Sequence, residues 1–188
     1  MDLLSILSAF GLSASAGLNA YIPLLIVALV GRFTNLIKLG EPWNALTNEW
    51  VIGALIILSV VEFFADKVPA VNHVNDAIQT FVRPAAGAVL FASSANVITD
   101  INPVLSLALG LLVSGGIHTV KSAAIRPAVT ATTGGVGNIP ISILEDVISF
   151  FVSLLALIVP VLMGIFLLII AFLILWWVIR RRGRFEKA

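Results

Sequence analysis

The distribution of charged residues constrains this chain more than any other feature. The 188 residues include only 11 Lys and Arg and 10 Asp and Glu, so 11% of the chain is charged and 60% is hydrophobic. A soluble domain has about 25% charged residues. A chain of this length cannot hide so much apolar surface in its own core, because surface dominates volume at that size. The sequence therefore predicts an integral membrane protein. Long stretches carry no charge at all: 3–31, 50–61, 84–99, 101–120 and 147–179.

These charge-free stretches predict membrane-spanning helices, because a helix of about 20 apolar residues crosses the hydrocarbon core and satisfies its own backbone. Two local signals support the boundaries. Asn102-Pro103 resembles a helix start, and Ser142 to Glu145 fits a capping box. We expect an all-α integral membrane protein with about six transmembrane helices, at roughly 4–30, 50–66, 77–98, 103–126, 142–159 and 160–180.

The last stretch leaves the number of spans open between five and six. It covers 147–179, which is long for one crossing and short for two. Basic residues favour the cytoplasmic side of a membrane. Six spans place nine of the 11 Lys and Arg there, including those of the basic tail at 181–188, whereas five spans place seven there. The sequence therefore favours six spans with both termini in the cytoplasm.

Two alignments suggest an internal repeat, and the sequence leaves the choice between them open. Residues 15–20 resemble 114–119, in spans that would run in opposite directions. This pairing predicts a three-plus-three inverted repeat, as in many secondary transporters, although small residues are also ordinary helix-packing surfaces. A rival alignment pairs 74–82 with 144–152, in spans that would run the same way. The halves of the inverted repeat would be about 1–98 and 102–180.

Ionisable side chains gather at the cytoplasmic end of the predicted bundle. Glu62 and Asp66 lie four residues apart and therefore share one face of a helix, as do His118 and Lys121 on another. A charge inside a span costs about 2.5–3.5 kcal/mol or more, so such residues normally pair or line a hydrated path. We expect Glu62 or Asp66 to pair with Lys121 or Arg126.

The candidate ion or substrate pathway combines these ionisable residues with polar residues near the middle of the first and fourth spans. Its members are Glu62, Asp66, His118, Lys121, Arg126, Asn19, Ser15 and Ser114. Arg83, Glu145 and Asp146 are secondary candidates, since an acid near a helix N-terminus can have a purely local role. If the ion is a cation, Glu62 and Asp66 are its candidate ligands. The glycine-rich stretch 130–138 is either a loop that binds an anion through its N–H groups or a cation through its carbonyls, or only a connector.

Motifs of soluble enzymes are missing from the sequence. There is no zinc motif, nucleophile elbow, dinucleotide fingerprint or P-loop, and the chain has no Cys. We therefore expect no enzymatic activity and no cofactor. The basic tail is expected to meet anionic lipid headgroups, so it does not indicate a nucleic-acid partner.

The stretch from His118 to Arg126, followed by Asn138 and by Ser-x-x-Glu-Asp at 142–146, resembles an uncharacterised bacterial family of multi-pass membrane proteins, domain-of-unknown-function family 4126. Residues 17–23 and 62–69 resemble the same family, so the likeness covers most of the chain. It implies the bacterial inner membrane and transfers no function. A weaker likeness links residues 62–67 to the Glu-x-Gly-Asp-Lys signature of inverted-repeat cation exporters, although this chain lacks the glycine.

Three functions fit these observations. The first is a secondary transporter or channel for an ion or small polar solute, which the acidic residues at depth favour. The second is a lipid-handling protein in which His118, Lys121 and Arg126 hold a phosphate headgroup. The third is a scaffold whose charges only lock the bundle. The expected partners are the bilayer, a small ion or solute, and a second copy of this 20.0 kDa chain in a homodimer.

Overall fold

The structure is a computed structural model that describes residues 3–67, 69–95, 102–160, 162, 165, 168–170, 172, 173 and 176. Within these residues the chain is helical and contains no strand. The elements in chain order are α1 (Leu3–Leu18), α2 (Tyr21–Phe33), the 3-10 helix η1 (Trp43–Thr47), α3 (Glu49–Ala65), α4 (Pro69–Ala95), α5 (Pro103–Val120), the π-helical turn η2 (Lys121–Ile125), α6 (Arg126–Thr133) and α7 (Asn138–Ile158).

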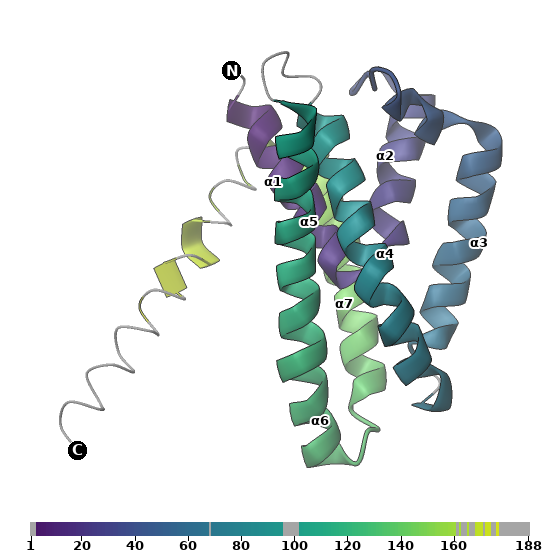
Figure 1. The fold of residues 1–188 in the computed structure, drawn as a ribbon, viewed down its shortest axis with the longest axis vertical. Helices are drawn as coiled ribbons and strands as arrows, with labels where there is room; N and C mark the ends of the chain where they lie inside the picture. Colours follow the sequence, from purple (N-terminus) through teal and green to yellow (C-terminus); the bar gives the residue numbers. More distant parts are fainter. Residues whose placement is uncertain are drawn as a thin grey trace.

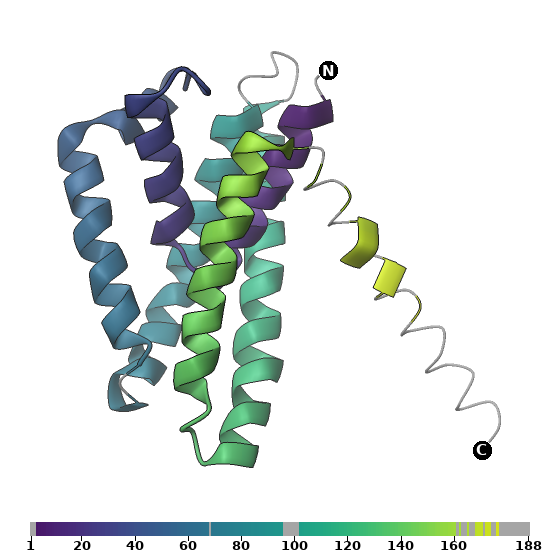
Figure 2. The same cartoon turned by 180° about the vertical axis from the view of Figure 1, so that it is seen from behind.

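The first predicted span, 4–30, is wrong as a single crossing, because the helix breaks at Asn19. Figures 1 and 2 show α1 descending from the end of the bundle where the chain begins and α2 returning to that same end. The Asn19 side chain causes the break by capping α2, since its Oδ1 accepts hydrogen bonds from the backbone N–H groups of Tyr21 and Ile22. Pro23 also disfavours a continuous helix, because its ring would clash with the carbonyl four residues earlier. The first segment is therefore a hairpin that enters and leaves at one end.

The remaining helices run alternately along the bundle. In both views α3 descends, α4 returns, α5 and α6 descend as one rod, and α7 returns. The rod Pro103–Thr133 is continuous through the η2 turn. A π turn just before Pro127 accommodates a residue that lacks an N–H and crowds the preceding turn. The predicted start at Asn102 is confirmed, because its side chain accepts from the N–H of Val104 at 2.8 Å.

The capping box predicted at Ser142 is wrong. Helix α7 begins at Asn138, one turn before Ser142, so both Ser142 and Glu145 lie inside the helix and are buried. Their side chains are directed to ionic partners on other helices instead of to the local backbone. The residues that match a capping box therefore belong to a buried polar face of α7.

Helix α1 occupies the centre of the bundle and packs against α4, α5 and α7. Contacts between α1 and α5 follow the same order along both helices. Ser13 Oγ donates to the carbonyl of Gly110, and, further along each helix, Gly17 lies against Ser114 and Ile117. The two helices are therefore parallel. The prediction that these segments run in opposite directions is wrong, and this pairing does not support an inverted repeat. The division into halves at 1–98 and 102–180 stays a prediction.

The polarity of two helices, α5 and α7, is inverted relative to that of helices in a soluble bundle. On α5 the buried residues are Ser106, Gly110, Ser114 and His118, whereas Leu111 and Leu112 are exposed. Helix α7 follows the same pattern, with bulky aliphatic and aromatic side chains on the outside and mostly polar ones inside. Two helices, Pro103–Thr133 and Asn138–Ile158, are long and apolar enough to cross a membrane by length and composition.

The sixth predicted span, 160–180, lies largely outside the described residues, and the basic tail at 181–188 lies wholly outside them. Whether that stretch forms a further span therefore stays a prediction, whereas a total of six that counts 4–30 as one crossing is wrong. The other predicted spans correspond to helices, although α4 begins at Pro69, before the expected 77, and the rod continues to Thr133, beyond the expected 126.

Candidate functional site

A network of charged side chains lies in the half of the bundle that contains the α3–α4 turn and α6. Every one of its members is at least partly buried. Five of them are almost completely inaccessible: Glu62, Asp66, Arg83, His118 and Lys121 are 0–3% exposed. The members come from four helical segments and are Glu62, Asp66, Lys67, Asp76, Arg83, His118, Lys121, Arg126, Glu145 and Asp146.

The deepest part of the network is a chain of three residues from three helices. Arg83 of α4 donates from Nη2 to Glu62 Oε1 of α3 at 2.9 Å, and from Nη1 to His118 Nδ1 of α5 at 3.2 Å. Because a guanidinium can only donate, His118 Nδ1 must be an acceptor. His118 Nε2 then carries the hydrogen and donates to Thr80 Oγ1 at 3.2 Å, while the Thr80 hydroxyl donates to the carbonyl of Asp76. The imidazole is therefore neutral in this arrangement.

Asp66 is the hub of the network. The predicted pairing with Arg126 is confirmed at 3.0 Å, and Lys121 lies at 3.9 Å. Asp66 also accepts from Asn75 at 2.7 Å and lies 3.6 Å from Arg83. Glu62, in contrast, pairs with Arg83 and not with either predicted cation. The two carboxylates expected to bind a cation thus hold a guanidinium between them.

Arg126 links the hub to the outer part of the network. Its Nη1 donates to both oxygens of Asp76 at 3.0 and 3.1 Å, and its Nη2 lies 3.4 Å from Glu145. Glu145 in turn forms a 2.7 Å ion pair with Lys121. These buried, charge-assisted contacts hold α3, α4, the α5–α6 rod and α7 in one register.

The break between α1 and α2 is joined to this network at two points. Asn19 Nδ2 donates to Asp146 Oδ1 at 2.9 Å, and Asp146 also pairs with Lys67 at 3.2 Å. Lys121 Nζ donates to the carbonyl of Leu18, the last residue of α1, at 2.9 Å. An ammonium at a helix C-terminus is favoured by the helix dipole. The ends of the two half-helices are therefore fixed by charged residues of η2 and α7.

The two candidate serines lie beside the network and not within it. Ser114 Oγ donates to the backbone carbonyl of Arg83 at 2.7 Å, so it holds the α4 backbone at the deepest arginine. Ser15 Oγ lies 2.8 and 2.6 Å from the hydroxyls of Ser149 and Ser153 on α7. Ser15 therefore joins α1 to α7 on the side of the charged residues that is nearer the start of α1.

The network contains more acidic than basic side chains. Among the described side chains it holds five acids (Glu62, Asp66, Asp76, Glu145, Asp146) and four bases (Lys67, Arg83, Lys121, Arg126), so their formal charge is −5 + 4 = −1 with His118 neutral. Each of the four bases contacts at least one carboxylate. The site therefore has more negative oxygen acceptors than positive groups to occupy them.

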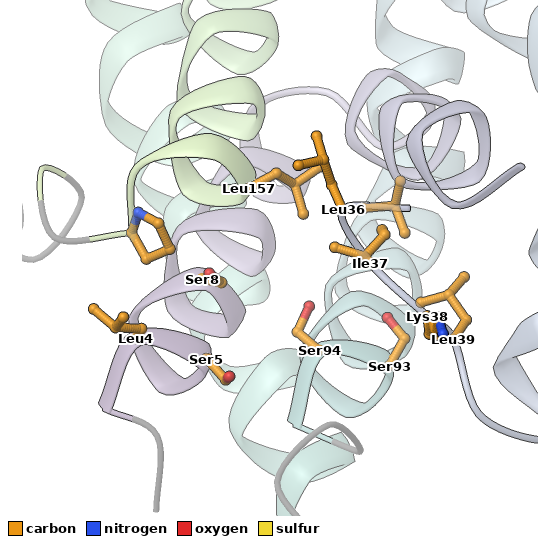
Figure 3. A pocket seen from close by; sticks show the side chains of 12 residues that line it. Leu4, Ser5, Ser8, Leu36, Ile37, Lys38, Leu39, Ser93, Ser94 and Leu157 are labelled. Carbon is orange, nitrogen blue, oxygen red and sulfur yellow. The ribbon is translucent and has the colours of Figure 1, made fainter. Parts of the chain in front are cut away.

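Two cavities lie at opposite ends of the bundle. One, of about 400 Å³, borders the network and is lined by Asp76, Ser122, Arg126 and Asn138 among others. The other, of about 250 Å³, lies among the upper ends of α1, α4 and α7 and is shown in Figure 3. Its walls combine apolar side chains such as Leu36 and Leu157 with serine hydroxyls from α1 and α4.

The glycine-rich stretch 130–138 is shorter as a loop than predicted. Helix α6 continues to Thr133, and the turn is made by Gly134 and Gly135, whose positive φ values of 63° and 93° suit glycine. Thr130 and Asn138 flank the turn, line the 400 Å³ cavity and are joined by a 2.8 Å hydrogen bond. The described residues contain no cluster of three His, Cys, Asp or Glu side chains that could hold a metal ion.

Sequence reasoning missed several residues on α4 and α7 that complete the site. Thr80, Asn75 and Ser142 all bond directly to members of the network, and Asp76 forms an ion pair with Arg126. A signal for α4 was present, because Asp76, Thr80 and Arg83 recur at helical spacing and so share one face. No local signal identifies Ser142.

The matches to known proteins agree with the resemblance found in the sequence. No curated protein matches the chain, and no solved structure matches it. Residues 6–181 match the family described as "Domain of unknown function (DUF4126)", which covers the hairpin, the network and α7 together. Because this match extends over most of the chain, the protein belongs to the DUF4126 family.

Proposed function

We propose that this chain is a multi-pass protein of the bacterial inner membrane that acts, without catalysis, as a secondary transporter or channel for an ion or small polar solute. The inverted polarity of α5 and α7 supports the membrane part of the proposal. Side chains such as Ile57, Phe64 and Leu112 are 63–67% exposed, while the charged residues face inward. Exposed apolar surface on this scale is stable when lipid replaces water as the solvent.

The helix break at Asn19 carries the transport part of the proposal. In many secondary transporters the ion and substrate sites lie where a helix is interrupted, because the free backbone groups and the dipole ends of the half-helices face the ligand. Here the break is buried inside the bundle, and Asp146 and Lys121 bind its two sides. A movement of the hairpin would therefore change the contacts of the charged network directly.

The state of the basic residues argues against the lipid-headgroup alternative. A phosphate would need free cations, yet Lys121 already pairs with Glu145 and Arg126 with Asp66 and Asp76. A bound anion would have to displace these carboxylates inside a site that already has a surplus negative charge. No observation favours a scaffold over a transporter. The start of α1 and the charged network lie at opposite ends of the bundle, so the expectation that both face the cytoplasm is not part of the proposal. Coupling to an ion and homodimer formation are parts of it.

The test is flux in proteoliposomes with a panel of monovalent and divalent cations and a pH-sensitive dye. Wild type is compared with Asn19→Ala, which removes both the cap of α2 and the bond to Asp146. Asn35→Ala is the matched control, because Asn35 lies exposed in the loop after α2. We expect flux in wild type and in the control and its loss in folded Asn19→Ala. Absence of flux from well-folded wild type would refute the proposal.

A further inference from the structure

Glu62 is the one acid of the deep network with an oxygen left unsatisfied. Its Oε1 accepts from Arg83, but its Oε2 has no hydrogen-bond partner among the described residues, although the side chain is only 1% exposed. Asp66, one turn further along, is held by three cations and two polar side chains. A buried carboxylate oxygen without a partner is costly, so a missing ligand is indicated at Glu62 and not at Asp66.

A second unpartnered acceptor lies on the facing helix. Gln79 of α4, one turn before Arg83, is 2% exposed, and its Oε1 also has no partner in the described part of the chain. Tyr21, at the start of α2, interacts with the Gln79 side chain and with the charge of Glu62. The region between α2, α3 and α4 thus has two buried acceptors without a partner, and the buried Nε–H of Arg83 satisfies neither of them, since it too has no partner among the described residues.

Charged groups surround this region from every packed element. Arg83 of α4 contacts Glu62 directly, Asp66 follows on α3, and Lys121 of η2 acts on Glu62 from the rod. His118 of α5 reaches it through Arg83, and Glu145 of α7 through Lys121. One added positive charge would bring the formal charge of the network from −1 to zero.

We propose that Glu62 Oε2 reversibly binds one proton, that the Gln79 side-chain amide positions this carboxylic acid, and that the proton is the ion coupled to transport. The proton leaves a hydronium ion in the aqueous phase and bonds to Oε2, which converts the carboxylate to a neutral acid with an O–H donor. For its role in coupling the inference rests on the proposed function, but the binding itself does not require transport.

A proton suits the site better than a metal ion does. Hard metal ions need about six oxygen ligands, whereas the described side chains at Glu62 supply few free oxygens and a guanidinium lies 2.9 Å away. A proton needs only one oxygen and one acceptor. It also removes the net charge without requiring room in the packed interior.

Infrared spectroscopy of the full chain in lipid tests the proposal, because a protonated carboxyl has a carbonyl band that a carboxylate lacks. We expect such a band to form between mildly alkaline and mildly acid pH in wild type and in Glu49→Gln, whose acid is exposed at the opposite end of α3. The band should be absent from Glu62→Gln. In Gln79→Leu it should remain but shift, because the neutral acid loses its hydrogen-bond partner.

Two results would overturn the inference: no Glu62-dependent band in this pH range, or a band that Gln79→Leu leaves unchanged. These failures differ from failure of the proposed function. A Glu62 band in a protein that moves no ion or proton would leave the proton site standing and refute transport. Ion flux without the band would support transport and refute the proton site.

Discussion

Gly17 of α1 lies directly against the backbone of Ser114 in α5: a Cβ atom at Gly17 would be 2.6 Å from the Ser114 carbonyl oxygen. The contact brings the end of the first half-helix close to the segment that carries His118 and Lys121. Backbones approach this closely only where one of them has no side chain, as in many membrane-helix interfaces. The site therefore depends on a glycine that makes no polar contact with it.

Replacing Gly17 with Ala should destabilise the bundle by about 1–3 kcal/mol, because the added methyl group overpacks a contact with rigid backbone. Thermal unfolding in detergent measures this change. Gly116→Ala is the matched control, since no described atom lies within 4 Å of a Cβ built there. The control should be neutral or slightly stabilising, and equal effects of the two substitutions would contradict the packing argument.

Replacing Arg83 with Gln should cost about 3–5 kcal/mol of stability, because it leaves Glu62 as a buried charge without its partner. The double variant Arg83→Gln with Glu62→Gln should recover part of that loss. Arg32→Gln removes an ion pair of the same kind between exposed side chains, Arg32 and Glu49. That change should cost about 0–1 kcal/mol. If Arg32→Gln and Arg83→Gln lowered the free energy of unfolding equally, the buried network would not stabilise the fold as described.

Replacing Lys121 with Met should loosen the tip of the hairpin. The substitution removes the hydrogen bond to the Leu18 carbonyl and the cation at the C-terminus of α1. Hydrogen exchange followed by mass spectrometry should show faster exchange in a peptide covering 15–22, with little change at the start of α1. Lys38→Met, in the loop after α2, should leave that peptide unchanged. Equal protection in Lys121→Met and wild type would show that the lysine does not hold the break.

The hairpin and a continuous first span place the start of α1 on different sides of the membrane relative to α6. Because the chain has no Cys, single cysteines can be labelled with a membrane-impermeant maleimide. Leu4→Cys and Asn35→Cys should label from one side of the membrane and Thr132→Cys from the other, since the start of α1 and the end of α2 lie at the end of the bundle opposite to α6. A single crossing at 4–30 instead places Leu4 and Thr132 on the same side.

Much of the fold could be predicted from local patterns. The start at Asn102-Pro103 was found because cap and proline signals act within a few residues, and helix positions followed from charge-free runs. The break at Asn19 was missed because apolar composition continues across it. The apparent capping box at Ser142 was misread because the same polar residues serve a buried face, which no local rule distinguishes from a helix end.

The sequence by itself determined the class of structure and the composition of the site. Long charge-free runs allow only helices with apolar outer faces, and the few buried charges had to find partners because an unpaired charge in the interior is too costly. Only the tertiary structure decided which partners they found. Glu62 pairs with Arg83 instead of Lys121, and α1 lies parallel to α5, because those contacts depend on helix direction and on close approach at Gly17. Such relationships join residues far apart in the chain, and spacing along the sequence does not contain them.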